Sequence, residues 1–134
     1  MLILPTAFQS QIIAEARAAL PAECCGLLEG VREQDTLRIT TLHPTANMAS
    51  DPLSGFEIDP AVHLRLLRTL RDTHREIVGC YHSHPNGRAE PSPRDRANGC
   101  EDGFVWIIVA VTADLTLAAF EGPHFQPLLV RGSL

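Results

Sequence analysis

The chain has 134 residues, of which 45% are hydrophobic and 20% charged, a balance that predicts one globular domain over residues 1–134 with a real core. The net charge of −5 does not indicate a nucleic-acid partner. We recognise neither a signal peptide nor the ~20 apolar residues that span a membrane, so we expect a cytoplasmic protein without a membrane partner.

The first 45 residues are predicted to contain a strand, a helix and two further strands. Apolar residues at helical spacing indicate a helix over Thr6–Leu20, in which Thr6 and Gln9 form a capping-box pattern and Pro21 stops the helix. The predicted strands are Leu2–Leu4, Cys24–Gly30 and Thr36–Leu42.

The middle of the chain is predicted to be a loop followed by a helix. Thr45–Gly55 is rich in Asn, Ser, Asp and Pro, which is typical of a loop, and Phe56–Ile58 is predicted to be a brief strand. Asp59 followed by Pro60 is a strong helix start, and we expect this helix to end near His74. Its predicted apolar stripe comprises Leu64, Leu67 and Leu70.

The same helix carries a run of basic residues. They are Arg65, Arg68, Arg71 and Arg75, with His63 and His74 beside them. Their spacing places much of the run on one helix face. Two interpretations stay open: a solvated helix face, which is the more common case, or a docking surface for an acidic protein partner.

The C-terminal half is predicted to hold most of the sheet. After the strand Ile77–Ser83 comes a loop over Pro85–Pro93, and Ser92 can cap a short helix that runs to about Asn98. The predicted strands that follow are Phe104–Thr112, Leu115–Phe120 and Phe125–Val130, the first of them central and buried. This order predicts an α/β or α+β sandwich, with helices against a mixed sheet.

Two imidazoles and a carboxylate lie close together in the sequence. Side chains alternate along a strand, so His82 and His84 point the same way about 6.6 Å apart, while Ser83 points to the other face. Asp95 follows eleven residues after His84, across the Pro-rich loop. Two nitrogens and one oxygen would leave one zinc position for water, as in catalytic zinc sites.

This pattern has other interpretations. A His pair on a strand can be a hydrogen-bonded core pair, and the pattern H-x-H alone is weak. A TIM-barrel hydrolase with H-x-H needs about 250 residues, more than this chain has. The zinc-deaminase signature is missing.

The four cysteines are expected to be reduced and mostly buried, as in a cytosolic protein. They are Cys24, Cys25, Cys80 and Cys100, and the adjacent pair would point to opposite faces of a strand. Cys80 shares the face of His82 and His84. It would lie ~13 Å from His84 along an extended strand, which favours buried packing over metal ligation.

The complete pattern resembles the motif of the JAMM (MPN-plus) metalloprotease family. The stretch from His82 to Asp95 reads H-S-H-P, then Ser92 and Asp95, with no departure from the family's spacing. The family also has an upstream Glu, and here Pro21-Ala22-Glu23-Cys24-Cys25-Gly26 is similar to its context. The resemblance covers nearly the whole chain and implies the cytidine-deaminase-like MPN/JAMM fold.

The resemblance and the chemistry imply a role for each motif residue. His82, His84 and Asp95 would hold one Zn²⁺, and Glu23 would act as general acid and base. Ser92 would donate a hydrogen bond to the developing oxyanion, although its hydroxyl could instead serve as a helix cap. Two further residues are expected to support the site: Ser83, by bracing the loop, and Pro85, by turning the chain out of the strand.

The resemblance also implies a substrate class. Family members cleave peptide or isopeptide bonds after the C-terminal Gly-Gly of ubiquitin-like proteins, and this chain is similar to the small bacterial members that process sulfur carriers. We therefore expect a ubiquitin-like sulfur-carrier partner whose tail lies in a groove, with Thr45–Gly55 as a groove wall. The alternatives are a peptidase of another small peptide or amide, and a non-catalytic interaction module of the same fold. The sequence assigns no oligomeric state.

Overall fold

The computed structural model describes residues 1–99, 101–112 and 115–133, so Cys100 lies outside the described residues. Three helices are described: α1 (Thr6–Ala19), α2 (Pro60–Thr69) and α3 (Pro93–Asn98). The strands are β1 (Leu2–Ile3), β2 (Cys25–Glu33), β3 (Thr36–Thr45), β4 (Glu76–His84), β5 (Val105–Ala110), β6 (Thr116–Glu121), β7 (Gln126–Leu128) and β8 (Val130–Arg131).

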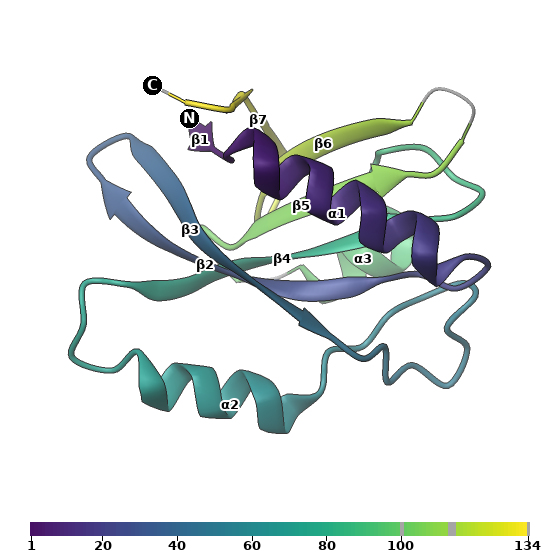
Figure 1. Cartoon of the computed structure of the whole chain (residues 1–134), viewed down its shortest axis with the longest axis horizontal. Coiled ribbons are helices and arrows are strands. Elements are labelled where there is room, and N and C mark those ends of the chain that lie inside the picture. The colour runs from purple at the N-terminus through teal and green to yellow at the C-terminus, as the bar shows by residue number, and fades with distance from the viewer. Residues whose placement is uncertain (100, 113–114, 134) are drawn as a thin grey trace.

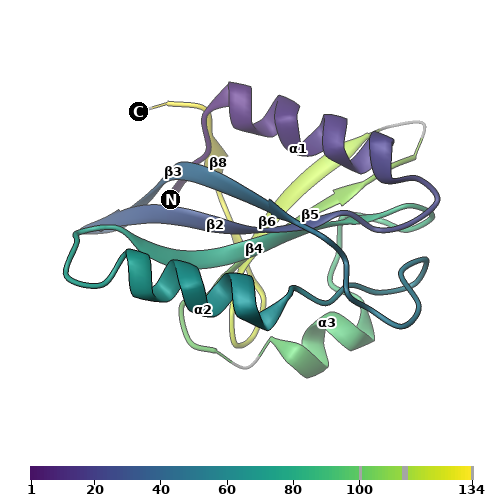
Figure 2. The ribbon, with the colours of Figure 1, turned by 60° about the horizontal axis from the view of Figure 1, so that its bottom comes forward.

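The strands form one eight-stranded mixed sheet in the order β7-β6-β5-β4-β2-β3-β1-β8. The neighbouring strands β4 and β5 are parallel, whereas β2 pairs antiparallel with both β3 and β4. Helix α1 lies on one side of this sheet, and α2 and α3 lie on the other (Figures 1 and 2). The predicted fold, a mixed sheet flanked by helices, is confirmed.

The two edges of the sheet approach each other at the C-terminal end of the chain. The sequence predicted one strand over Phe125–Val130, and this prediction is wrong: β7 pairs with β6 at one edge, and β8 pairs with β1 at the other. Only Leu129 separates β7 from β8, and its carbonyl accepts a hydrogen bond from the Leu2 N–H at 2.9 Å. The sheet is therefore strongly curled, and the two termini lie near each other (Figure 1).

Each face of the sheet has its own apolar cluster. The face toward α1 buries Ile12 of the helix with Tyr81 and Ile107 of the strands, and the Tyr81 hydroxyl donates to Glu15 at 2.7 Å. The opposite face packs aromatic side chains around Trp106. Side chains alternate between these faces along β4, so His82 and Ser83 near its C-terminal end point to opposite faces. The close packing of each face holds them rigidly.

Several predicted details of the first helix and of the middle segment are wrong. Helix α1 has no capping box: its cap residue is Pro5, and the Gln9 side chain donates to the Leu4 carbonyl. Phe56–Ile58 is not a strand and contributes a single isolated bridge, between Ile58 and Asn47. The Asp59 cap of α2 is present, but α2 ends at Thr69, short of His74.

The predicted apolar stripe of α2 is right at Leu70 and wrong at Leu64 and Leu67. Leu64 and Leu67 are each 48% exposed, whereas Leu66 packs against the aromatic cluster and Leu70 is buried. Apolar residues at 62, 66 and 70 follow a four-residue spacing that competes with the predicted one.

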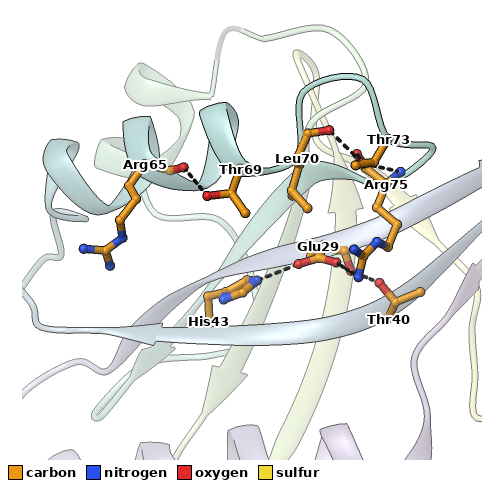
Figure 3. A network of polar contacts seen from close by, with 8 residues as sticks. All are labelled: Glu29, Thr40, His43, Arg65, Thr69, Leu70, Thr73 and Arg75. Carbon is orange, nitrogen blue, oxygen red and sulfur yellow. Dashed lines mark hydrogen bonds and ion pairs between the residues drawn. The ribbon is translucent and has the colours of Figure 1, made fainter.

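A buried carboxylate anchors the segment that follows α2 (Figure 3). Glu29 of β2 lies 2.8 Å from the His43 ring on β3 and 3.0 Å from the Arg75 guanidinium. The Thr73 hydroxyl closes the turn by donating to the Leu70 carbonyl at 2.7 Å. One member of the basic run, Arg75, thus pairs with a buried carboxylate although its own side chain is 44% exposed, and the other three arginines are exposed as well. Docking of an acidic partner on them stays a prediction.

Over the described residues, no helix combines the length and the apolar character that crossing a bilayer requires.

Candidate metal centre and active site

Three side chains converge at the C-terminal end of β4. The His82 Nε2 and His84 Nε2 atoms lie 3.1 Å apart, and they lie 3.1 and 3.2 Å from the same Asp95 oxygen, Oδ2. Asp95 reaches them from α3, across the loop that the sequence predicted to fold it back. Ligand atoms ~2.0–2.1 Å from a tetrahedral zinc would be separated by about 3.3 Å, so these spacings fit one small cation.

The protonation of His84 also fits a cation. Its Nδ1 lies 2.8 Å from the carbonyl oxygen of Arg88, a contact that requires a proton on Nδ1. In the neutral ring, Nε2 then presents a lone pair to the Asp95 carboxylate. This arrangement is repulsive unless a proton or a metal ion lies between them.

The pKa shifts favour a negatively charged Asp95 beside the two imidazoles. Burial would raise the pKa of Asp95, but hydrogen bonds with His82 and His84 hold it well below its usual range. Burial opposes the charged form of His84, yet contacts with Asp95 and the Arg88 carbonyl raise its pKa above the usual value. Burial lowers the pKa of His82. The cluster is thus a carboxylate that stays ionised beside two imidazoles.

His82 is held by aromatic packing. Its ring stacks on Phe56 with centroids 4.2 Å apart and meets the edge of Trp106 at 5.9 Å. The side chain is fully buried, and among the described residues its Nδ1 has no hydrogen-bond partner. Phe56 therefore contributes to the site, a role that was not predicted from the sequence.

Cys80 does not join this cluster. It is buried in the aromatic cluster beside Leu27 and Trp106, as its predicted packing role requires. Burial raises its pKa well above the usual value, which disfavours the thiolate that a metal would need. Cys24, Cys25 and Cys80 are all free thiols, so the described cysteines form no disulfide.

Ser92 caps α3 in a reciprocal capping box. Its hydroxyl oxygen accepts from the Asp95 N–H at 3.0 Å, and its own N–H donates to Asp95 Oδ2 at 2.9 Å. A hydroxyl that accepts one hydrogen bond still has its proton to donate. The cap and the predicted oxyanion contact are therefore compatible. The cap also orients the carboxylate that faces the two imidazoles.

Glu23 lies two residues before β2, and its side chain approaches the same cluster. One carboxylate oxygen of Glu23 and one nitrogen each of His82 and His84 lie within 4.8 Å of one another. Glu23 is only 7% exposed, and this burial raises the pKa of its carboxyl to about 7. A carboxyl with this pKa can accept and release a proton near neutral pH.

Backbone and side-chain contacts fix the main chain at Glu23. Its N–H donates to the Pro52 carbonyl at 2.8 Å, and its carbonyl accepts from the Asn47 side chain at 3.0 Å. The next N–H, of Cys24, donates to the Ser83 hydroxyl at 2.8 Å. Ser83 was expected to brace the loop, and no partner was predicted for its hydroxyl; the Cys24 N–H is the partner that the structure gives it. Asn47 received no predicted role, although a lone Asn in a polar loop is a typical turn-organising residue.

A small cleft lies beside three of these groups. Its volume is about 220 Å³, and its lining includes Glu23, His84 and Ser92. Pro85, which directly follows the last residue of β4, forms part of the wall. Leu53 and Ser54, from the loop over residues 45–55, form another part.

The chain is similar to several characterised proteins along most of its length. The family described as prokaryotic homologs of the JAB domain matches residues 5–121. A desampylase of Haloferax volcanii is 34% identical over 110 residues, which are 82% of this chain and 78% of the desampylase. A probable TtuB-protein conjugate cleaving protease of Thermus thermophilus is 36% identical over 88 residues, covering 63% of this chain and 56% of that protein. A CysO-cysteine peptidase of Mycobacterium tuberculosis is 27% identical over 82% of this chain and 73% of its own.

Solved structures show the same fold. A Desulfitobacterium hafniense protein superimposes with a TM-score of 0.82 at 26% identity, covering 100% of this chain and 95% of its own. A structure described as a JAMM metalloprotease-like zinc site has a TM-score of 0.60 at 17% identity, covering 97% of this chain and 95% of its own, which supports the fold alone. The chain therefore belongs to the prokaryotic JAB domain family, and its predicted resemblance to the JAMM (MPN-plus) proteins is confirmed.

Proposed function

We propose that this protein is a zinc-dependent peptidase that cleaves the bond after the C-terminal Gly-Gly of a ubiquitin-like sulfur-carrier protein. The observation that carries the proposal is that Glu23, His84 and Ser92, which come from three separate segments, line one cleft. A structural His pair would need neither a buried carboxyl whose pKa is about 7 nor a hydroxyl beside it.

His82, His84 and Asp95 would hold the zinc ion, since two imidazoles and one carboxylate are a common catalytic ligand set with one open position. When bound, zinc would polarise the scissile carbonyl and lower the pKa of the attacking water. The Arg88 carbonyl fixes the ring of His84 with Nε2 toward this position. The capping box does the same for the Asp95 carboxylate.

The remaining chemistry falls to two side chains of the cleft. Glu23 takes a proton from the attacking water and later delivers it to the leaving amine. The free hydroxyl proton of Ser92 donates to the oxygen on which negative charge develops. The nearly complete burial of Glu23 keeps bulk water away from the proton that it carries.

The relatives support the substrate class. Their names describe cleavage of conjugates or of a carrier-linked cysteine: desampylase, TtuB-protein conjugate cleaving protease and CysO-cysteine peptidase. The small volume of the cleft, about 220 Å³, suits a tail with small residues beside the proposed metal ligands. Leu53 and Ser54 support the assignment of the loop over residues 45–55 as a groove wall.

The test is cleavage of a ubiquitin-like carrier that bears a short extension after Gly-Gly, followed by intact mass. The zinc-loaded wild type should release the extension. Glu23→Gln should retain zinc and lose activity by about 10²–10⁴-fold, because general acid–base catalysis typically contributes that much.

A carrier in which Gly-Gly is replaced by Ala-Ala serves as the matched substrate control and should be cleaved far more slowly. Intact substrate after incubation with the wild type, or equal cleavage by Glu23→Gln, would contradict the proposal. Equal cleavage of the two carriers would contradict the Gly-Gly specificity alone.

A further inference from the structure

We propose that Asn47 and Ser83 are positioning residues. They hydrogen-bond the carbonyl and the N–H of the Glu23–Cys24 peptide group, and this contact, called the grip below, fixes the Glu23 carboxylate beside His82 and His84. The inference rests on the proposed role of Glu23 as general base. It assigns a function to two side chains that lie outside the metal cluster.

The Asn47 side chain uses all of its ordinary hydrogen-bonding capacity. Its Nδ2 donates to the carbonyls of Glu23 at 3.0 Å and Gly55 at 2.9 Å. Its Oδ1 accepts from the N–H groups of Ala49 at 3.0 Å and Glu57 at 3.1 Å. The Asn47 side chain thus connects the start of the loop to its end at Gly55 and Glu57, and connects both to Glu23.

Ser83 holds the other end of the same peptide group. Its hydroxyl accepts from the Cys24 N–H at 2.8 Å, while the Glu23 carbonyl on the opposite side of that peptide accepts from Asn47. Ser83 is fully buried and stands between His82 and His84 on β4. The strand that carries two candidate ligands is therefore tied directly to the backbone of the candidate base.

The grip is needed because the Glu23 carboxylate is buried, which is energetically unfavourable. An unrestrained chain would relieve the cost of burial by turning the carboxylate toward water. Fixing the peptide group opposes that movement. The loop that Asn47 closes also supplies Leu53 and Ser54 to the cleft, so one side chain sets the position of both the base and the wall.

Amide hydrogen exchange tests the grip without any assay of activity. The Glu23 N–H is bonded to Pro52, not to Asn47, so its exchange reports whether the loop stays attached. In metal-free Asn47→Asp and Asn47→Ala we expect this amide to exchange about tenfold faster or more. The amides of Ala49 and Glu57 should lose protection only in Asn47→Ala, because Asp keeps an accepting oxygen.

The matched control is Asp59→Ala, which removes the side chain that accepts from the Ala61 N–H and caps α2. This change alters no hydrogen bond of Glu23 or of the Asn47 side chain. It should cost comparable stability and leave the Glu23 amide protected. Unchanged exchange at Glu23 in both Asn47 variants, or an equal rise in Asp59→Ala, would overturn the grip.

Activity and zinc content then separate positioning from general damage. Asn47→Asp and Ser83→Ala should lower kcat about 10–100-fold and change KM less, because a small misplacement of a catalytic group has effects of this size. Bound zinc should stay at the wild-type level, since the ligands lie on β4 and α3.

Wild-type kcat in these variants, or a loss of zinc in proportion to the loss of activity, would overturn the positioning role. An inactive wild type would instead contradict the proposed function, and the exchange experiment would still decide whether the grip exists.

Discussion

At the scale of single residues, the sequence motif predicted which side chains lie together, because it fixes side-chain types at fixed spacings. Their metal-binding and catalytic roles stay predictions. His82, His84 and Asp95 are brought together as the alternation along β4 and the Pro-rich loop required. Spacing could not predict the contacts of neutral residues. The Asn47 side chain contacts the distant Glu23 carbonyl, and the Ser83 hydroxyl contacts the Cys24 N–H ahead of β2.

Ser92 offers a test of its two roles. Ser92→Gly removes the hydroxyl, and a Gly cap costs only a few tenths of a kcal/mol, so the fold should be nearly unaffected. We expect kcat to fall about 10²–10³-fold through the loss of one oxyanion donor, as measured by steady-state cleavage of the carrier. Ser92→Thr keeps a hydroxyl and should recover much of the rate. Equal activity of the Gly and Thr variants would show that the hydroxyl acts only as a cap.

Glu23 makes the stability of the metal-free protein depend on pH. Its carboxyl pKa is about 7 in the folded state, against an ordinary 4.5, so the folded state binds the proton more tightly than the unfolded chain does. The contribution of Glu23 to the free energy of unfolding therefore falls as the pH rises from 4.5 to 7. The Gln side chain of Glu23→Gln does not titrate. Above pH 7 the free energy of unfolding of this variant should therefore exceed that of the wild type by up to about 3 kcal/mol, and below pH 4.5 the loss of titration should cause no difference.

Urea unfolding of both metal-free proteins at several pH values measures this difference. Glu90→Gln, at an exposed side chain, is the control and should follow the wild type. A stability difference between Glu23→Gln and wild type that is the same at every pH would contradict the assigned burial effect.

At the scale of elements, apolar patterns predicted the central strands and failed where two patterns compete. Val105–Ala110 is a buried strand, as its apolar, β-branched run indicated. In α2, by contrast, leucines occupy two overlapping helical stripes, and tertiary packing selects Leu66 and Leu70 over Leu64 and Leu67. The sequence carries no signal that decides between such stripes.

The segment after α2 depends on the buried carboxylate of Glu29. Arg75→Met removes the cation at 3.0 Å and leaves Glu29 with His43 as its remaining charged or polar side-chain contact among the described residues. Because Arg75 is partly exposed and its charge is screened, we expect a loss of about 1–2 kcal/mol rather than the full cost of breaking a buried pair. Arg71→Met, at an exposed arginine of the same run, should change stability by less than about 0.5 kcal/mol. Urea unfolding measures both, and equal effects would contradict the anchoring role.

At the scale of the whole molecule, the site exists because the sheet order brings distant segments together. Cys25 pairs with His82 across β2 and β4, which places Glu23 beside candidate ligands about 60 positions further along the chain. Local pattern alone could not predict this pairing, and the role expected for Glu23 came from the family resemblance. The curling of the sheet was missed for a related reason: β8 crosses to the far edge after one intervening residue.

The most direct test of the central claim is carrier cleavage measured against bound zinc. The metal-free protein should not cleave, and activity should rise linearly to a maximum at one ion per chain. His82→Ala should neither bind zinc with wild-type affinity nor regain activity. Full activity of the metal-free protein, or saturation of zinc at one ion without cleavage of the Gly-Gly extension, would contradict the account.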